Sequence, residues 1–236
     1  MEKVITSEQT GGAYATEKLT ILVIAPHTDD AELGAGASIN RWQLEGHRVI
    51  IVNLSDTRNI NGSTVGLRLR DEATKASAAL GVERDDVIFG DFSTRHFSEE
   101  RQRILDFLIG LRLKIKPDIV IGPSISDSHQ DHSAVAQEIQ RAFKAITVLG
   151  FDTYWNISEQ KFPVVVEVSN LDISSKVKSL SAYSSQSAKP YMKKKNIMGQ
   201  AAMRGLPRGF DYAEAFSVEQ ISMNLDARIG KLSDRE

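Results

Sequence analysis

Three side chains that can bind a metal ion or move a proton lie within four residues, at His27, Asp29 and Asp30. A second cluster, at residues 128–132 (SHQDH), carries two imidazoles about a hundred positions later. His27 and Asp30, joined by His132, would offer two imidazoles and a carboxylate, a set that suits Zn²⁺ or another divalent metal. Three protein ligands leave a coordination position open for water, which is typical of a catalytic metal site.

The remaining side chains of the two clusters have roles in the hydrolysis that such a metal supports. A bound metal lowers the pKa of its water from about 15.7 to about 7 and polarises a substrate carbonyl. Asp29 is expected to act as the general base on that water. We expect His129 to stabilise an oxyanion or protonate a leaving amine, and Asp131 to orient an imidazole, as carboxylates around metal ligands do.

Each cluster taken alone has a simpler interpretation. Paired carboxylates after a strand often cap a helix or face solvent, and two histidines three residues apart are often structural. Their joint occurrence at the ends of two neighbouring strands would favour a functional site. His47 and His96 lack such neighbours and are interpreted as structural residues.

The elements that must position these clusters alternate between strands and helices. Nearly continuous apolar runs at residues 19–25, 48–54, 86–89 and 118–122 predict strands buried on both faces. Helices are expected from Glu32 to Gly46, at 67–80, after a cap at Ser98 and at 133–143, with polar loops at 55–65 and 124–132. Further strands are expected at 148–151 and 162–168, and helices at 171–183 and 191–203.

This alternation predicts an α/β fold, a mostly parallel sheet with helices on both faces. In such sheets ligands bind beyond the carboxyl ends of the strands, where the strand order reverses. The first and fourth strands are commonly neighbours at that point. The topology would therefore bring the two clusters into one crevice.

Composition excludes several other functions. The formal net charge of −2 over 236 residues gives no basic surface for nucleic acid. The absence of cysteine excludes disulfides and thiolate metal sites. The sequence has neither a membrane-spanning run nor a signal-like N-terminus, so we expect a cytoplasmic protein. Residues 1–18 are expected to form a flexible arm and residues 19–236 a single domain.

The two clusters also resemble the motifs of the LmbE-like, or PIG-L, family of zinc-dependent de-N-acetylases. Residues 26–32 (PHTDDAE) are similar to the family's His-Pro-Asp-Asp-Glu motif, with Thr28 in place of proline, and residues 129–132 (HQDH) match its His-x-Asp-His motif in full. Segments 68–72, 183–186 and 212–216 are similar to further family signatures, so the resemblance runs from about Leu19 to Phe216.

The resemblance implies a Rossmann-like three-layer αβα fold and removal of an N-acetyl group from an amino sugar or a sugar conjugate. It implies the same roles as the chemistry above: His27, Asp30 and His132 as zinc ligands, Asp29 as the base, and His129 as the oxyanion or acid residue. A family arginine corresponds here to Leu69, so either Arg68 or Arg70 is a candidate for substrate binding. The family often forms oligomers, which leaves a homo-oligomer open.

Two other hypotheses remain at this stage. One is a family member that binds a sugar without hydrolysing it. The other is a phospho-accepting signalling domain, in which Asp91 would take the phosphoryl group and the acidic pair would bind Mg²⁺. Substrate choice is expected to depend on four loops over the crevice, at residues 55–65, 92–97, 152–161 and 184–189.

Overall fold

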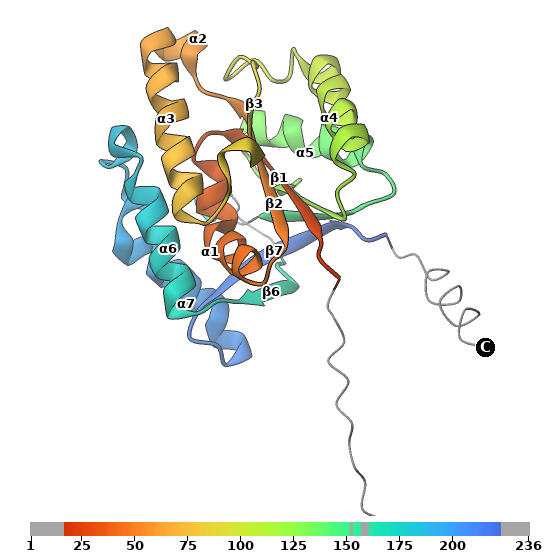
Figure 1. Ribbon diagram of the computed structural model, residues 1–236. Helices are drawn as coiled ribbons and strands as arrows, with labels where there is room; N and C mark the ends of the chain where they lie inside the picture. The colour runs from red at the N-terminus through yellow and green to blue at the C-terminus, as the bar shows by residue number, and fades with distance from the viewer. Residues whose placement is uncertain (1–16, 152, 157–160, 223–236) are drawn as a thin grey trace, which may run out of the picture.

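The protein is represented by a computed structural model that describes residues 17–151, 153–156 and 161–222 (Figure 1). All but the last two residues of the predicted arm lie outside these ranges. The first half of the fold consists of β1 (Thr20–His27), α1 (Asp30–Leu44), β2 (Arg48–Ser55), α2 (Arg58–Asn61), α3 (Ser63–Ala79), a 3₁₀ turn η1 (Arg84–Asp86), β3 (Val87–Phe89), α4 (Arg101–Ile115) and β4 (Ile119–Pro123). The second half consists of α5 (Gln130–Ala142), β5 (Thr147–Phe151), β6 (Val164–Glu167), α6 (Asn170–Ser181), the 3₁₀ turns η2 (Ser184–Gln186) and η3 (Pro190–Met192), α7 (Lys194–Gly205), η4 (Leu206–Arg208) and β7 (Ala213–Gln220).

The strands form one sheet in the order β3-β2-β1-β4-β5-β7-β6. The first five strands in that order run parallel, whereas β7 pairs antiparallel with both β5 and β6. Ile21 of β1 faces Val49 of β2 on one side and Ile119 of β4 on the other. The predicted mostly parallel α/β sheet is therefore confirmed, with β1 and β4 adjacent as expected.

Helices cover both faces of the sheet (Figure 1). Alternate residues of β1 serve the two sides: Leu22 and Ile24 pack in a core with α4 and α5, while Ile21 and Val23 pack with α1. Burial on both faces explains why β1 is an unbroken apolar run rather than an alternating one. Across the part of the chain that the structure describes, no helix is long and apolar enough to cross a membrane.

Gly122 of β4 lies against α5. A Cβ atom at this residue would lie 2.3 Å from Cδ1 of Ile139, so a larger residue here would require the Ile139 side chain to shift. Because α5 begins at Gln130, the second cluster lies in the loop before this helix and in its first turn.

Several predicted boundaries were wrong. Helix α1 begins at Asp30 rather than Glu32, and α5 begins at Gln130 rather than Ser133. Ser98 does not cap α4, which begins at Arg101. The predicted 55–65 loop contains α2 and the start of α3, separated by Gly62 at φ +86°, a conformation that favours glycine. The earlier start of α5 is capped by His129, whose side chain accepts the backbone N–H of Asp131.

Candidate functional site

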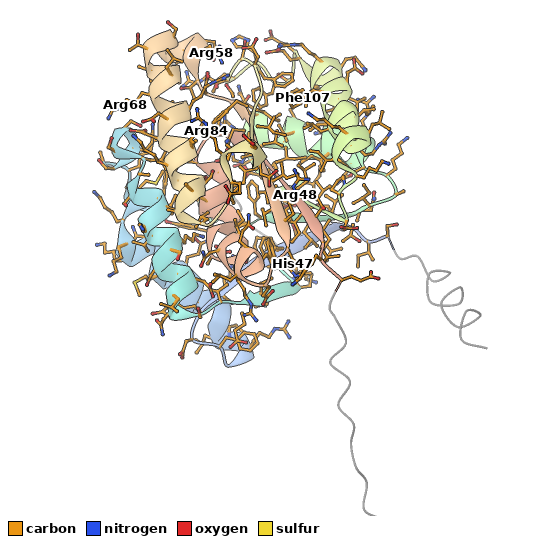
Figure 2. The ribbon with its side chains drawn as sticks, viewed as in Figure 1. His47, Arg48, Arg58, Arg68, Arg84 and Phe107 are labelled. Atoms are coloured by element: carbon orange, nitrogen blue, oxygen red, sulfur yellow. The ribbon has the colours of Figure 1, made fainter. Side chains whose placement is uncertain are left out.

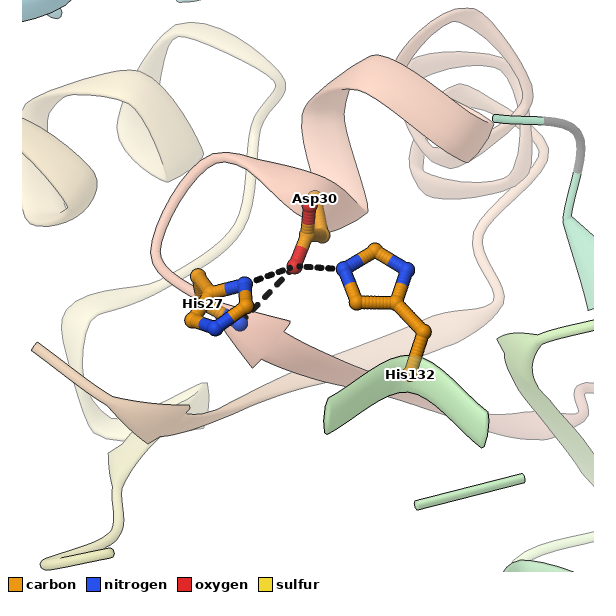
Figure 3. A group of neighbouring side chains, drawn as sticks. All are labelled: His27, Asp30 and His132. Carbon is orange, nitrogen blue, oxygen red and sulfur yellow. Dashed lines mark hydrogen bonds and ion pairs between the residues drawn. The ribbon is translucent and has the colours of Figure 1, made fainter. Parts of the chain in front are cut away.

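His27 and Asp30 come together because β1 ends where α1 begins. The Oδ2 atom of Asp30 accepts the backbone N–H of His27 at 2.8 Å, which closes the turn between strand and helix. The same oxygen lies 3.1 Å from Nδ1 of His27 and 3.1 Å from Nε2 of His132 (Figure 3). Two imidazole nitrogens from distant parts of the chain thus converge on one carboxylate oxygen.

His132 enters this group from the first turn of α5 and is oriented by Asp127. Oδ2 of Asp127 lies 2.8 Å from Nδ1 of the imidazole, which leaves Nε2 directed at Asp30. Asp127 is itself fixed by the Thr153 hydroxyl and by the backbone N–H of His129, which its Oδ1 accepts at 2.9 Å. Asp127 is a site residue that was not predicted from the sequence, although a carboxylate five residues before a candidate ligand was a usable signal.

His27 is held in the same way by Asp131. Its Nε2 atom lies 3.0 Å from Oδ2 of the fully buried Asp131, and its Nδ1 atom faces Asp30. Each histidine therefore has one ring nitrogen paired with a carboxylate behind it, Asp131 for His27 and Asp127 for His132, while its other nitrogen faces Asp30. This is the arrangement by which carboxylates orient metal-ligating histidines.

His27, Asp30 and His132 together fit a divalent metal ion. Their ligand atoms lie within 4.8 Å of one another, and two nitrogens with one oxygen is a donor set that zinc accepts. A second group, His27, His129 and Asp131, meets the same distance criterion. In that group Nδ1 of His129 accepts a backbone N–H, whereas both histidines of the Asp30 group have a carboxylate on their outer ring nitrogen. The geometry therefore favours the group centred on Asp30.

The electrostatics of the group call for a positive charge. Burial lowers the pKa of His27, but its hydrogen bonds to Asp131 and Asp30 outweigh this and raise it to about 9. Burial likewise opposes protonation of His132, yet the charge of Asp30 and the bond to Asp127 raise its pKa to about 10. The pKa of Asp30 is held well below its usual value, against burial, by the two histidines. A bound cation would supply the charge that the protons otherwise bring.

Asp29 and His129 line a cavity of about 290 Å³ beside the candidate ligands His27, Asp30 and His132. Burial and the neighbouring charge of Asp30 raise the pKa of Asp29, while Lys189 and His27 act against this rise. A raised pKa brings a carboxylate nearer to the range in which it can accept and release a proton. Asp29 is thus placed beside the ligand group without belonging to it.

His129 presents a ring N–H to the cavity region. Its Nδ1 atom accepts the backbone N–H of Asp131 at 3.2 Å as the cap of α5, so the neutral ring carries its proton on Nε2. Its centroid lies 5.2 Å from that of His27 and 4.8 Å from that of His132. Burial and these two histidines lower the pKa of His129, which favours the neutral, N–H-donating form.

The structure places the two candidate arginines outside the cavity. Arg68 pairs with Glu72 at 3.2 Å and donates to Ser184, on the outer side of α3 (Figure 2). Arg70 pairs with the buried Asp56. Among the described residues, Leu69 between them lines the cavity and neither arginine does.

All four predicted loops contribute to the cavity wall. The lining residues from these loops are Thr57, Ile60, Thr94, Arg95, Trp155, Asn156, Gln186 and Lys189. The rings of Trp155 and Tyr191 stack with centroids 4.3 Å apart and planes 10° from parallel. No pattern in the sequence predicted this pair, because it forms only where the segment of Trp155 meets the turn η3, which contains Tyr191.

Comparisons with known proteins agree on one family. A family model described as "PIG-L: GlcNAc-PI de-N-acetylase" matches residues 22–143. The chain is 30% identical over 166 residues to the uncharacterized deacetylase YaiS of Escherichia coli, covering 65% of this chain and 83% of that protein. It is 28% identical over 122 residues to the diacetylchitobiose deacetylase of Thermococcus kodakarensis, covering 48% of this chain but only 44% of the relative.

Solved structures share the fold. A conserved protein from Thermus thermophilus superposes with a TM-score of 0.74 at 23% identity, covering 88% of this chain and 98% of that one. The 4-carboxy-2-hydroxymuconate hydratase of Pseudomonas putida gives a TM-score of 0.73 at 17% identity, covering 88% and 99%. Because a hydratase has this fold, the reaction must be argued from the side chains of the site.

Proposed function

Because the chain belongs to the PIG-L family of de-N-acetylases, we propose that it hydrolyses an N-acetyl group on an amino sugar or a sugar conjugate. The products would be acetate and the free amine. The observation that carries this proposal is the convergence of His27 Nδ1 and His132 Nε2 on one oxygen of Asp30, with Asp29 and His129 on the adjoining cavity wall.

The proposed metal ligands are His27, Asp30 and His132, and the proposed metal is Zn²⁺. When bound, the ion would lower the pKa of water and polarise the acetamide carbonyl. Asp127 and Asp131 hold the two imidazoles in the ligating orientation. Such outer carboxylates keep the coordinating nitrogen unprotonated and correctly aimed.

Two side chains of the cavity would act on the reacting groups, one by proton transfer and one by stabilising charge. Asp29, whose pKa is raised by burial, accepts a proton from the attacking water. His129 directs its Nε2–H toward the developing oxyanion, where a fixed donor stabilises negative charge. Cleavage of the C–N bond then requires a proton on the leaving nitrogen, which Asp29 can return once it has been protonated.

The phospho-accepting hypothesis finds little support in this arrangement. The acceptor would have to lie beside Asp29, but β2 separates β3 from β1 in the sheet. Asp91 after β3 has a side chain that is 76% exposed, near Arg58 and Arg103. Asp91 is therefore a surface carboxylate.

Acetate release across a panel of N-acetylated sugars and conjugates, with and without a chelator, tests the proposal. We expect turnover of at least one compound, loss with chelator, and recovery when Zn²⁺ is restored. The His132→Ala variant should lose both the bound metal and turnover, whereas His96→Ala, at an exposed position, should keep both. Binding of a panel sugar with no acetate release by the zinc-loaded protein would favour the sugar-binding hypothesis instead.

A further inference from the structure

Tyr183 is a buried side chain beside the site that the proposed hydrolysis does not use. We propose that Tyr183 is a positioning residue for Asp29. Its hydroxyl group holds the peptide that joins Thr28 to Asp29, so that the Asp29 carboxylate faces the cavity. This inference rests on the proposed function and adds a residue that acts through the proposed base.

The ring of Tyr183 is fixed among three helices. The residue follows α6, which packs beside α1 and α3 (Figure 1). Tyr183 is 1% exposed and lies in a core cluster with Leu33 of α1, Ala76 of α3 and Ile197 of α7. Because side chains in a close-packed core interdigitate, the ring keeps its hydroxyl group in one direction.

The Tyr183 hydroxyl donates to the backbone carbonyl of Thr28, in the turn between β1 and α1. Thr28 is buried, so water does not replace this donor. Burial and the neighbouring carboxyl groups of Glu32 and Asp29 raise the pKa of Tyr183 well above its usual value, so the hydroxyl keeps the proton that it donates. Since a buried carbonyl without a donor is unfavourable, this bond fixes the direction of the Thr28 carbonyl.

The Thr28 carbonyl and the N–H of Asp29 belong to one planar peptide group. A donor that fixes the carbonyl therefore also fixes the plane from which Cα of Asp29 and its side chain extend. The Asp29 side chain makes no capping hydrogen bond to α1, so the helix cap does not orient the carboxylate. By contrast, the backbone N–H of His27 donates to Asp30, which holds these two candidate ligands to each other. The base and the ligands are thus held by separate bonds.

Ser179 provides a matched control on α6. Its buried hydroxyl donates to the backbone carbonyl of Ala76 on α3 at 2.8 Å, and neither residue lines the cavity. The Ser179→Ala and Tyr183→Phe variants each remove one buried hydroxyl that donates to a backbone carbonyl. The two variants should therefore lose similar stability, whereas only Tyr183→Phe alters the turn that carries Asp29.

The first test measures kcat, KM and zinc affinity, with the N-acetylated compound that the zinc-loaded wild type turns over best. Tyr183→Phe should lower kcat about 10- to 100-fold, because a small displacement of a catalytic group has this effect, and should change KM and zinc affinity by less than about threefold. Ser179→Ala should keep kcat within about twofold of the wild type, since the site geometry is unchanged.

A double-mutant cycle shows whether Tyr183 acts through Asp29. In the Asp29→Asn background, adding Tyr183→Phe should lower kcat by less than about twofold, because residues that act as one unit are not additive. A purely structural role of Tyr183 would instead lower kcat by the same factor in both backgrounds.

Hydrogen exchange of the metal-free proteins, followed by NMR, gives a readout that does not depend on turnover. Tyr183→Phe should speed exchange of the backbone amides at residues 29–33 by about tenfold or more, because the turn loses its bond to the residue after α6. Ser179→Ala should leave exchange at residues 29–33 as it is in the wild type.

The two readouts separate this inference from the proposed function. In an enzyme that releases acetate, no kcat loss in Tyr183→Phe, or an equal loss in both backgrounds, would overturn the inference alone. Absence of turnover on every compound would overturn the deacetylase assignment. The exchange data would then decide: faster exchange at residues 29–33 in Tyr183→Phe alone would uphold the positioning of this turn by Tyr183, and equal exchange in the two variants would overturn it.

Discussion

Asp127 Oδ2, in the loop between β4 and α5, lies 2.8 Å from Nδ1 of His132 in the first turn of α5. Both side chains are buried, and Asp127 receives further hydrogen bonds from Thr153 and from the backbone of His129. These bonds and the His132 charge lower the pKa of Asp127 despite its burial. The carboxylate therefore stays ionised and holds the imidazole with Nε2 aimed at Asp30.

Replacing Asp127 by alanine should weaken metal binding about 10- to 100-fold, the usual cost of losing a carboxylate behind a ligating histidine. The reason is that His132 would lose the bond that fixes its ring. Zinc affinity can be measured by competition with a chromophoric chelator. Asp106→Ala, at an exposed carboxylate on α4, should leave the affinity unchanged. Equal affinities for the Asp127 variant and the wild type would contradict the role of Asp127.

The Asp29→Asn variant should still bind the metal but lose most of its turnover. The amide has the shape of the carboxylate but cannot accept a proton from water, so kcat should fall by about 10²- to 10⁴-fold. Metal content is checked by elemental analysis and turnover by acetate release. If turnover survived with metal content unchanged, the general base would have to be another group. The proposed metal ligands would not be affected by that result.

Glu32→Gln should change the pH dependence of stability. Burial raises the pKa of Glu32 from 4.5 to about 8, and the charge of Asp29 adds to this. Because the folded pKa lies above the unfolded one, the stabilising contribution of Glu32 is complete below about pH 4.5 and is lost as the pH rises through about 8. The free energy of unfolding should thus fall with pH in the wild type, by at most about 1.4 kcal/mol per pH unit from this group, and less in the variant.

Urea unfolding of metal-free protein at pH 5.5, 7 and 8.5 measures this difference. Other groups of the site titrate in both proteins, so the comparison with the variant isolates Glu32. Parallel pH profiles would mean that Glu32 is ionised in the fold throughout this range.

Lys176→Met should destabilise the fold by about 3–5 kcal/mol, because it leaves a buried carboxylate without its partner. The ammonium of Lys176 lies 2.6 Å from Glu214, and both side chains are 5% exposed. Glu214 also accepts the backbone N–H groups of Ala37 and Ser38, so the pair anchors α1, the helix that begins at Asp30.

Denaturant unfolding followed by circular dichroism gives the free energy change for this variant. Lys178→Met, at an exposed lysine on α6, the helix that also carries Lys176, should change the free energy of unfolding by less than about 0.5 kcal/mol. Adding Glu214→Gln to Lys176→Met should recover part of the loss, since the unpaired charge is then removed. A loss equal to that of Lys178→Met would contradict the anchoring role.

Much of the fold and of the proposed ligand set could be predicted from the sequence alone. Strand β1 is buried on both faces, and this leaves an unbroken apolar run whose end at His27 is visible without a structure. The ligand candidates His27 and Asp30 are three residues apart, so local geometry joins them. The alternation of strands and helices then placed His132 beside them, because parallel strands with crossover helices have few arrangements.

Only the tertiary structure showed which side chains surround the group of His27, Asp30 and His132. Asp131 was expected to orient an imidazole and contacts His27, whereas the pairing of Asp127 with His132 depends on side-chain directions that no spacing rule specifies. Arg68 was a candidate for substrate binding by its position in the sequence, but in the structure its guanidinium forms an ion pair with Glu72.

Arg95 and Lys189 reach the cavity from loops about ninety residues apart in the chain, and the Trp155–Tyr191 stack likewise joins a loop to the turn η3. Local propensity sets regular elements, whereas the conformation of a loop depends on the distant residues that it contacts. The sequence therefore determined the sheet and the candidate ligands at its switch point, and only tertiary packing decided which charges and rings line the cavity.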